Sequence, residues 1–171
     1  RLKNNFFTFK KKKDYKILKE TKILHQKRKD LSKIQIIEFS ILFILLNYFE
    51  KVSEKLEDIS NIIFLAENNE SLKNVIINSL AEGDDKQNIN LKVQGKYDKI
   101  IQEINENSNI QIITKNKTNK EILILIDELI QDHKEQSNLK KIESLEQKLI
   151  NNLDENSYSE LIKLKSQINR E

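Results

Sequence analysis

The scarcity of chain-breaking residues constrains the fold of this chain more than any other feature. Its 171 residues contain no proline and two glycines, Gly83 and Gly95. Sandwiches and barrels of short strands depend on tight turns, and those turns are rich in these two residue types. The sequence therefore predicts an all-α protein: a helical bundle followed by a C-terminal helical hairpin, with a basic N-terminal arm.

Charge is distributed unevenly, although the net charge is only +3. Residues 1–33 carry 13 Lys/Arg and 3 Asp/Glu, a balance of +10, whereas residues 34–171 carry 17 and 24, a balance of −7. The basic arm is either a weak nucleic-acid contact through phosphates or a solvated linker, and the sequence leaves both interpretations open. The absence of cysteine excludes disulfides, thiolate metal sites and a cysteine nucleophile.

The most apolar stretch, IQIIEFSILFILLNYF at 34–49, predicts a central helix that is buried on nearly every side. At 16 residues, with polar interruptions, it is shorter than the roughly 20 apolar residues of a membrane span. A second helix is expected around 72–80, with Ser71 as its cap and Gly83 as its stop. The candidate strand NIQIITK, 109–115, has no obvious pairing partner, so we expect it to be extended or helical.

One long helical pattern extends from about residue 119 to 152. Its first half is apolar over a wide arc, which suits a core. Its second half narrows to a stripe that needs only one partner, formed by Leu139, Ile142, Leu145, Leu149 and Ile150.

The segment that follows, LDENSYSELIKLKSQINRE at 153–171, predicts this partner helix. Asp154 is placed to cap it, and a carboxylate also suits the positive end of a helix. Its apolar side comprises Tyr158, Leu161, Ile162, Leu164 and Ile168. We therefore predict three regions: a basic arm at 1–33, a bundle at 34–132 and a hairpin at 133–171.

Residue types that carry chemistry do not form a recognisable active site. His25 and His133 lie far apart in polar surroundings, without a second ligand at metal-binding spacing, so we expect both at the surface. Asp84 and Asp85 follow Gly83 and are expected in a solvated turn rather than as a catalytic pair. The sequence predicts a chain without catalytic residues, cofactor or metal.

The order of these segments resembles the C-terminal region of bacterial DnaG primases, especially the alphaproteobacterial type. The stretch EFSILFILLNYFEKVSEKLEDISNIIFLAENNESLKNVIINSL is similar to the region that follows the catalytic core in that family. The stretch LEQKLINNLDENSYSELIKLKSQINRE is similar to the closing hairpin. The likeness spans residues 34–171 and rests on segment order and apolar pattern, not on a catalytic motif.

This resemblance implies a cytoplasmic, non-catalytic module whose hairpin docks on the N-terminal domain of the replicative helicase DnaB during primer synthesis. The basic arm would then be the tail of the preceding catalytic region. Tyr158 would act as an aromatic anchor, and the basic side chains would supply charge at the rim. The implied partner-binding residues are Leu149, Leu153, Tyr158, Leu161, Ile162, Lys165 and Arg170.

Two alternatives stay open at this level. Each apolar member of that set is equally suited to the seam inside the hairpin. The composition and the basic arm also suit a structural accessory subunit of a large organellar assembly, such as a mitochondrial ribosome.

Overall fold

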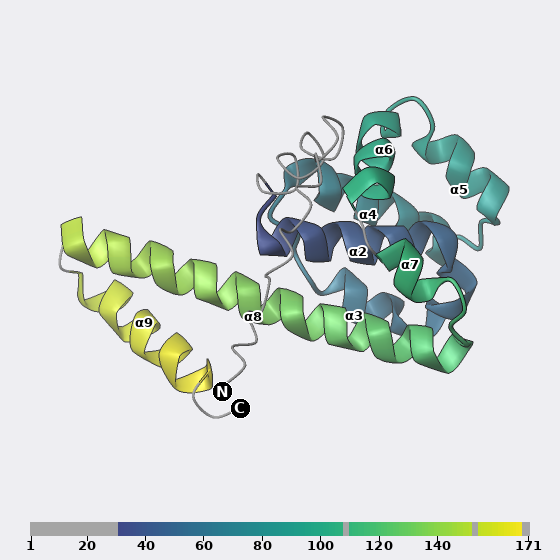
Figure 1. The fold of residues 1–171 in the computed structure, drawn as a ribbon. Coiled ribbons are helices and arrows are strands. Elements are labelled where there is room, and N and C mark those ends of the chain that lie inside the picture. Colours follow the sequence, from purple (N-terminus) through teal and green to yellow (C-terminus); the bar gives the residue numbers. More distant parts are fainter. Residues whose placement is uncertain (1–30, 108–109, 152–153, 169–171) are drawn as a thin grey trace, which may run out of the picture. The chain divides into compact units, whose positions relative to one another are not determined.

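The computed structural model describes residues 31–107, 110–151 and 154–168, and helices are the only regular secondary structure within these ranges (Figure 1). The predicted all-α fold is confirmed, while most of the predicted basic arm lies outside the described residues. In chain order the elements are α2 (Lys33–Asn47), the 3-10 turns η1 (Phe49–Lys51) and η2 (Ser53–Lys55), α3 (Leu56–Ser60), α4 (Glu67–Ala81), α5 (Lys86–Val93), α6 (Asp98–Asn107), α7 (Ile110–Thr114), α8 (Asn119–Asn151) and α9 (Glu155–Ile168).

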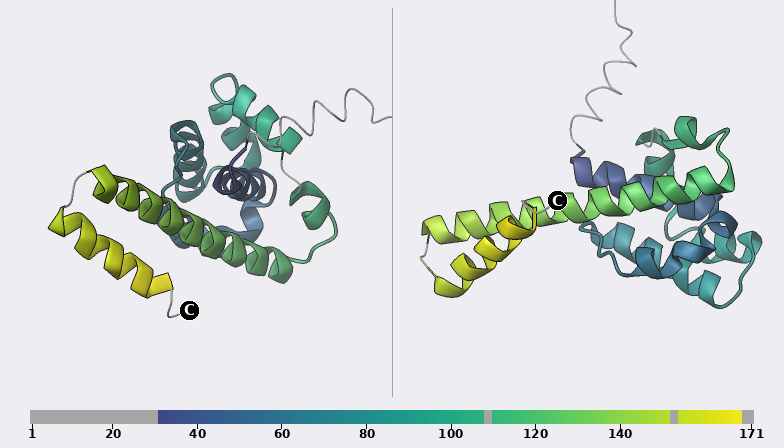
Figure 2. Two further views of the ribbon diagram at one scale, coloured as in Figure 1. Left: turned by 60° about the vertical axis from the view of Figure 1, so that its left-hand side comes forward. Right: turned by 90° about the horizontal axis from the view of Figure 1, so that it is seen from below.

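Helix α2 forms the centre of the bundle, as the sequence predicts. Every residue from 37 to 45 is buried, and α4, α6, α7 and α8 all pack against it. Figure 2 (left) looks almost along α2 and shows the other helices around it. The helix starts cleanly because Ser32 and Gln35 form a reciprocal capping box. No helix within the described ranges combines the length and apolarity that a membrane crossing requires.

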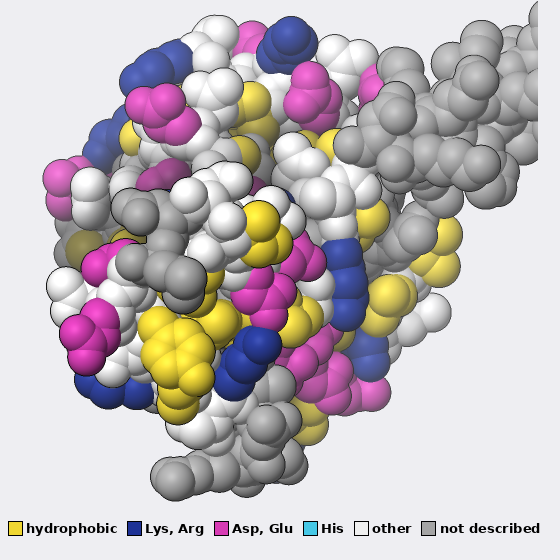
Figure 3. All heavy atoms as spheres, turned by 90° about the vertical axis from the view of Figure 1, so that its left-hand side faces the viewer, with side chains coloured by type: hydrophobic (Ala, Val, Ile, Leu, Met, Phe, Trp, Pro, Cys, Tyr) yellow, Lys and Arg dark blue, Asp and Glu magenta, His cyan; other side chains and the backbone are white. Residues whose placement is uncertain are grey.

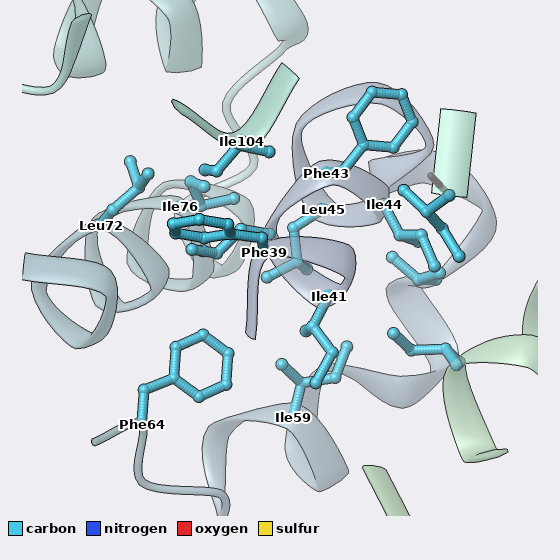
Figure 4. Packing of buried hydrophobic residues seen from close by; sticks show 14 of the residues in the cluster. Phe39, Ile41, Phe43, Ile44, Leu45, Ile59, Phe64, Leu72, Ile76 and Ile104 are labelled. Atoms are coloured by element: carbon cyan, nitrogen blue, oxygen red, sulfur yellow. The ribbon is translucent and has the colours of Figure 1, made fainter. Parts of the chain in front are cut away.

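The core is built from the side chains that radiate from α2. Phe39 points towards Ile76 of α4 and Ile104 of α6, while Ile41 points towards Ile59 of α3 (Figure 4). Apolar burial of this kind supplies most of the stability of a bundle, at about 25 cal/mol per Å² removed from water. The apolar side chains of α2 cover a wide arc because other helices of the bundle pack against several of its sides.

One local prediction needs correction, and two are confirmed. The candidate strand at 109–115, expected to be extended or helical, forms the short helix α7 over Ile110–Thr114, and no strand lies in the described part of the chain for it to pair with. Ser71 does not cap α4, which already begins at Glu67; its hydroxyl lies 2.8 Å from that of Tyr97. Gly83 does stop α4, and its φ of +83° is a conformation that glycine adopts without strain.

A cluster of polar side chains holds the segment between α3 and α4 against the bundle; Glu38, Asn69, Lys73 and His133 are buried, and Glu70 is half-buried. Glu38 accepts hydrogen bonds from the Leu65 backbone N–H at 2.6 Å and from Asn69 Nδ2 at 2.8 Å. Lys73, fully buried, donates to the Ile62 carbonyl and pairs with Glu70 at 2.9 Å. Since buried charges are tolerated only when paired, this cluster fixes the path of residues 62–65.

The prediction that His133 lies at the surface is wrong. Its side chain is 1% exposed, its ring packs against Phe64, and its Nε2 atom lies 3.6 Å from Glu38 Oε1. That separation is too long for a hydrogen bond, and both ring nitrogens are buried without a hydrogen-bond partner among the described residues. The sequence around His133 is polar because its neighbours along α8 face solvent. His133 therefore belongs to the bundle, and the hairpin proper begins after it.

Glu38 makes the stability of the bundle depend on pH. Burial raises the pKa of this carboxyl, but the His133 ring and the donors from Asn69 and Leu65 lower it more, so that it lies below its ordinary value of 4.5. Because the pKa of Glu38 is lower in the folded state than its ordinary value, the ionised carboxylate stabilises the fold above pH 4.5. This contribution to stability is lost as the pH falls through the folded-state pKa.

We predict that Glu38→Gln lowers the free energy of unfolding at pH 7 by about 1–3 kcal/mol, because an amide accepts hydrogen bonds more weakly and leaves its own NH₂ group buried. Denaturant melts at several pH values measure this. The gap between wild type and variant should narrow as the pH falls below 4.5 and through the lower folded-state pKa of the wild-type carboxyl. Glu50→Gln, at an exposed position, is the control. A gap that persists unchanged down to the lowest pH at which the wild type is still folded would contradict the assignment.

Candidate functional site

Helix α8 contributes to two separate apolar cores. Its first half packs on α2 through residues at helical spacing, Ile122, Ile126, Ile130 and His133. Further along, Ile142 and Leu145 are buried against α9 instead. The predicted narrowing of the apolar face therefore marks the point where α8 leaves the bundle and pairs with α9 (Figure 1).

Asp154 caps α9, as the sequence predicts. Its carboxylate accepts hydrogen bonds from the Ser157 backbone N–H at 2.9 Å and the Ser157 hydroxyl at 2.7 Å. These bonds hold the pKa of Asp154 below its ordinary value of 3.8. The cap gives α9 a defined first turn, which a short helix needs because isolated helices of this length are marginal in water.

The two helices meet along a narrow hairpin seam. Leu161 is 8% exposed and packs with Ile142 and Leu145. Leu149 and Leu164 are half-buried beside them. This seam is small, and it leaves the other apolar side chains of both helices outside it.

The hairpin has two unlike flanks. Tyr158, Ile162 and Lys165 share one side of α9, since they are four and seven residues apart. Lys165 Nζ lies 2.7 Å from Glu146 Oε1 of α8. By the same spacing, Glu146 shares its side of α8 with Leu139 and Ile150. The ion pair therefore joins these two sides into one continuous surface.

This surface, the apolar flank, consists of Leu139, Ile150, Tyr158 and Ile162. Ile150 is 75% exposed, Tyr158 55% and Ile162 51%. Figure 3, which views the left-hand side of Figure 1, shows hydrophobic side chains gathered there beside charged ones. The opposite flank is entirely polar and exposed, with Lys141, Ser144 and Lys148 from α8 and Asn156, Glu160 and Lys163 from α9. An exposed apolar surface on one side only is typical of a binding face.

The structure separates the predicted partner-binding residues into three groups. Tyr158, Ile162 and Lys165 lie on the exposed side of the hairpin. Leu149 and Leu161 lie in the seam, which is the alternative that the sequence leaves open for them. Leu153 and Arg170 lie outside the described residues. Binding by any of these residues stays a prediction.

The sequence predicts Leu139 and Ile150 on the same stripe as the seam residues, and this is wrong, because the structure leaves both side chains exposed and outside the seam. At about 100° per residue, they fall roughly a quarter turn away from the line through Ile142, Leu145 and Leu149. Their high exposure follows from this offset. A helical projection that separates the 142–145–149 line from the 139–146–150 line would have found them.

The remaining polar groups have structural roles. Asp85 caps α5 by accepting a hydrogen bond from the Asn88 N–H at 2.8 Å, and Asp84 pairs with Lys92 of that helix. Both lie in the turn after Gly83, as expected. Within the residues that the structure describes, no group of three or more acidic or histidine side chains could hold a metal ion.

Comparisons of the chain with protein-family models, with curated proteins and with solved structures find no match.

A pair of neighbouring substitutions tests the division between seam and flank. We predict that Leu161→Ala speeds amide hydrogen exchange throughout α9, because truncating a buried leucine costs about 2–5 kcal/mol. Ile162→Ala should leave exchange nearly unchanged, since half of that side chain is already exposed. Bundle amides such as those of α2 should be unaffected in both variants. Equal acceleration by the two substitutions would contradict the seam.

Proposed function

We propose that this chain is the helicase-docking module of a DNA primase. In this proposal the bundle carries the hairpin, and the hairpin binds the N-terminal domain of a DnaB-type replicative helicase in the cytoplasm during primer synthesis. The observation that carries the proposal is the one-sided hairpin, whose exposed Ile150, Tyr158 and Ile162 are not needed for its own folding.

The segment order supports the choice of partner. The central helix α2, the rest of the bundle and a two-helix hairpin follow one another as they do in the primase family that the sequence resembles. The hairpin is joined to the bundle by a continuous helix, α8, so that a bound partner would be held at a defined distance. The chemistry also fits a protein partner: aromatic and branched apolar side chains next to an ion pair form the usual centre and rim of an interface.

The proposed docking is expected to be of moderate strength. Burying one Ile or Phe-sized side chain contributes about 1.5–3 kcal/mol, and association costs several kcal/mol of translational and rotational freedom. A flank of this size therefore favours an association that forms and releases repeatedly. Such behaviour suits a primase, which must engage the helicase at each priming event.

We predict that Tyr158→Ala weakens binding to the N-terminal domain of the cognate helicase by about 1–2 kcal/mol, or about 5- to 30-fold in Kd. Ile162→Ala should have a similar effect. Isothermal titration calorimetry measures both. Lys163→Ala is the matched control, because Lys163 is exposed on the polar flank of the same helix.

Two results would count against the proposal. Global unfolding of Tyr158→Ala, seen as lost helicity in circular dichroism, would make Tyr158 a folding residue. Absence of any binding by the wild-type chain at low salt would remove the helicase as partner and favour the accessory-subunit interpretation.

A further inference from the structure

Beyond residue 127, the acidic side chains of α8 lie on one side of the helix. All five carboxylates from there to the end of the helix follow one line, with spacings of three, four or eight residues: Glu128, Asp132, Glu135, Glu143 and Glu146. Leu139 and Ile150 complete that line, so the acidic line runs directly into the apolar flank. Lys134, Lys141 and Lys148 occupy the polar side of α8 at intervals of seven, and Lys140, three residues before Glu143, lies between the two sides.

Three pairs on this line, Glu128–Asp132, Asp132–Glu135 and Glu143–Glu146, are three or four residues apart. Like charges three or four residues apart on a helix repel one another by a few tenths of a kcal/mol per pair. Glu146 is matched by Lys165, but the structure records no ion pair for Asp132 or Glu143 within its described part. Both are exposed beside Leu139. A negative potential is thus maintained around exposed apolar side chains.

We infer that the partner surface which binds this flank is a protein surface with lysine or arginine side chains around an apolar centre. Charge complementarity carries the inference: a basic rim would neutralise the carboxylates, and apolar side chains would cover Ile150, Tyr158 and Ile162. The inference rests on the proposed function and specifies the face of the helicase domain that is recognised. Nucleic acid does not fit, since phosphates would be repelled by the acidic line.

A second copy of this chain is a poorer occupant. A symmetric pairing of two such flanks would bring the acidic lines together. A head-to-tail pairing would set the acidic line against the lysines of the polar flank, but that flank exposes no apolar side chain to cover Tyr158 or Ile162. Neither pairing of two copies of the described hairpin therefore matches the apolar and the charged parts of this surface together.

The test compares Glu143→Lys with Glu160→Lys in the full chain. The two glutamates are exposed, lie on opposite flanks and change the net charge equally. Affinity for the helicase N-terminal domain is measured by calorimetry at about 50 and 300 mM salt. We expect Glu143→Lys to weaken binding at least fivefold at low salt, to lose less of its affinity than wild type when salt is raised, and to slow association. Glu160→Lys should bind like wild type.

The outcomes separate this inference from the proposed function. If Tyr158→Ala loses binding while Glu143→Lys binds as tightly as wild type, helicase docking stands and the basic partner surface is wrong. Tighter binding by Glu143→Lys would likewise overturn it. Self-association of wild type in sedimentation experiments, abolished by Glu143→Lys, would make a second copy the occupant. If the wild-type chain fails to bind at all, both the function and this inference are wrong.

Discussion

The rest of the structure depends on the hydrogen bonds that the buried carboxylate of Glu38 accepts. An ionised group at the centre of a bundle is stable only where polar groups surround it, and here they come from three other elements. Leu65 donates from the segment before α4, Asn69 from α4 itself, and His133 approaches from α8. Sliding any of these along α2 would leave the charge unmatched. Apolar packing alone tolerates such shifts more readily, so Glu38 fixes the register in which α8 crosses the bundle.

That register determines how the hairpin is presented. His133 and Ile142 are nine residues apart, which at about 100° per residue places them on nearly opposite sides of α8. The helix therefore turns one side to α2 and, beyond the bundle, almost the opposite side to α9 (Figures 1 and 2). Neither flank of the hairpin is needed to cover the core. The apolar flank is thus left exposed by the geometry of a single continuous helix.

The sequence predicts well which segments form helices, and predicts less well which side of each helix is buried. The scarcity of proline and glycine, the continuous apolar run of α2 and the Asp154 cap are local signals, and the structure agrees with each. His133 and the seam could not be read in the same way, because a residue is buried by what lies opposite it. His133 has polar neighbours along α8, yet Glu38 and Phe64, distant in sequence, enclose it. Likewise, Leu149 is half-buried and Ile150 is exposed because of the side of α8 against which α9 packs, and the sequence near these two residues does not determine that side.

The arrangement divides the work of recognition between two kinds of side chain. In the proposed complex, the carboxylates along α8 would act over about 10 Å at ordinary salt and so influence how fast a basic partner arrives. Tyr158, Ile150 and Ile162 would act only on contact and govern how long that partner stays. Because the seam keeps the hairpin folded through other residues, the flank can be altered without unfolding the helices that present it. Binding strength and stability are therefore separable properties of this hairpin, which is the condition for tuning a reversible association.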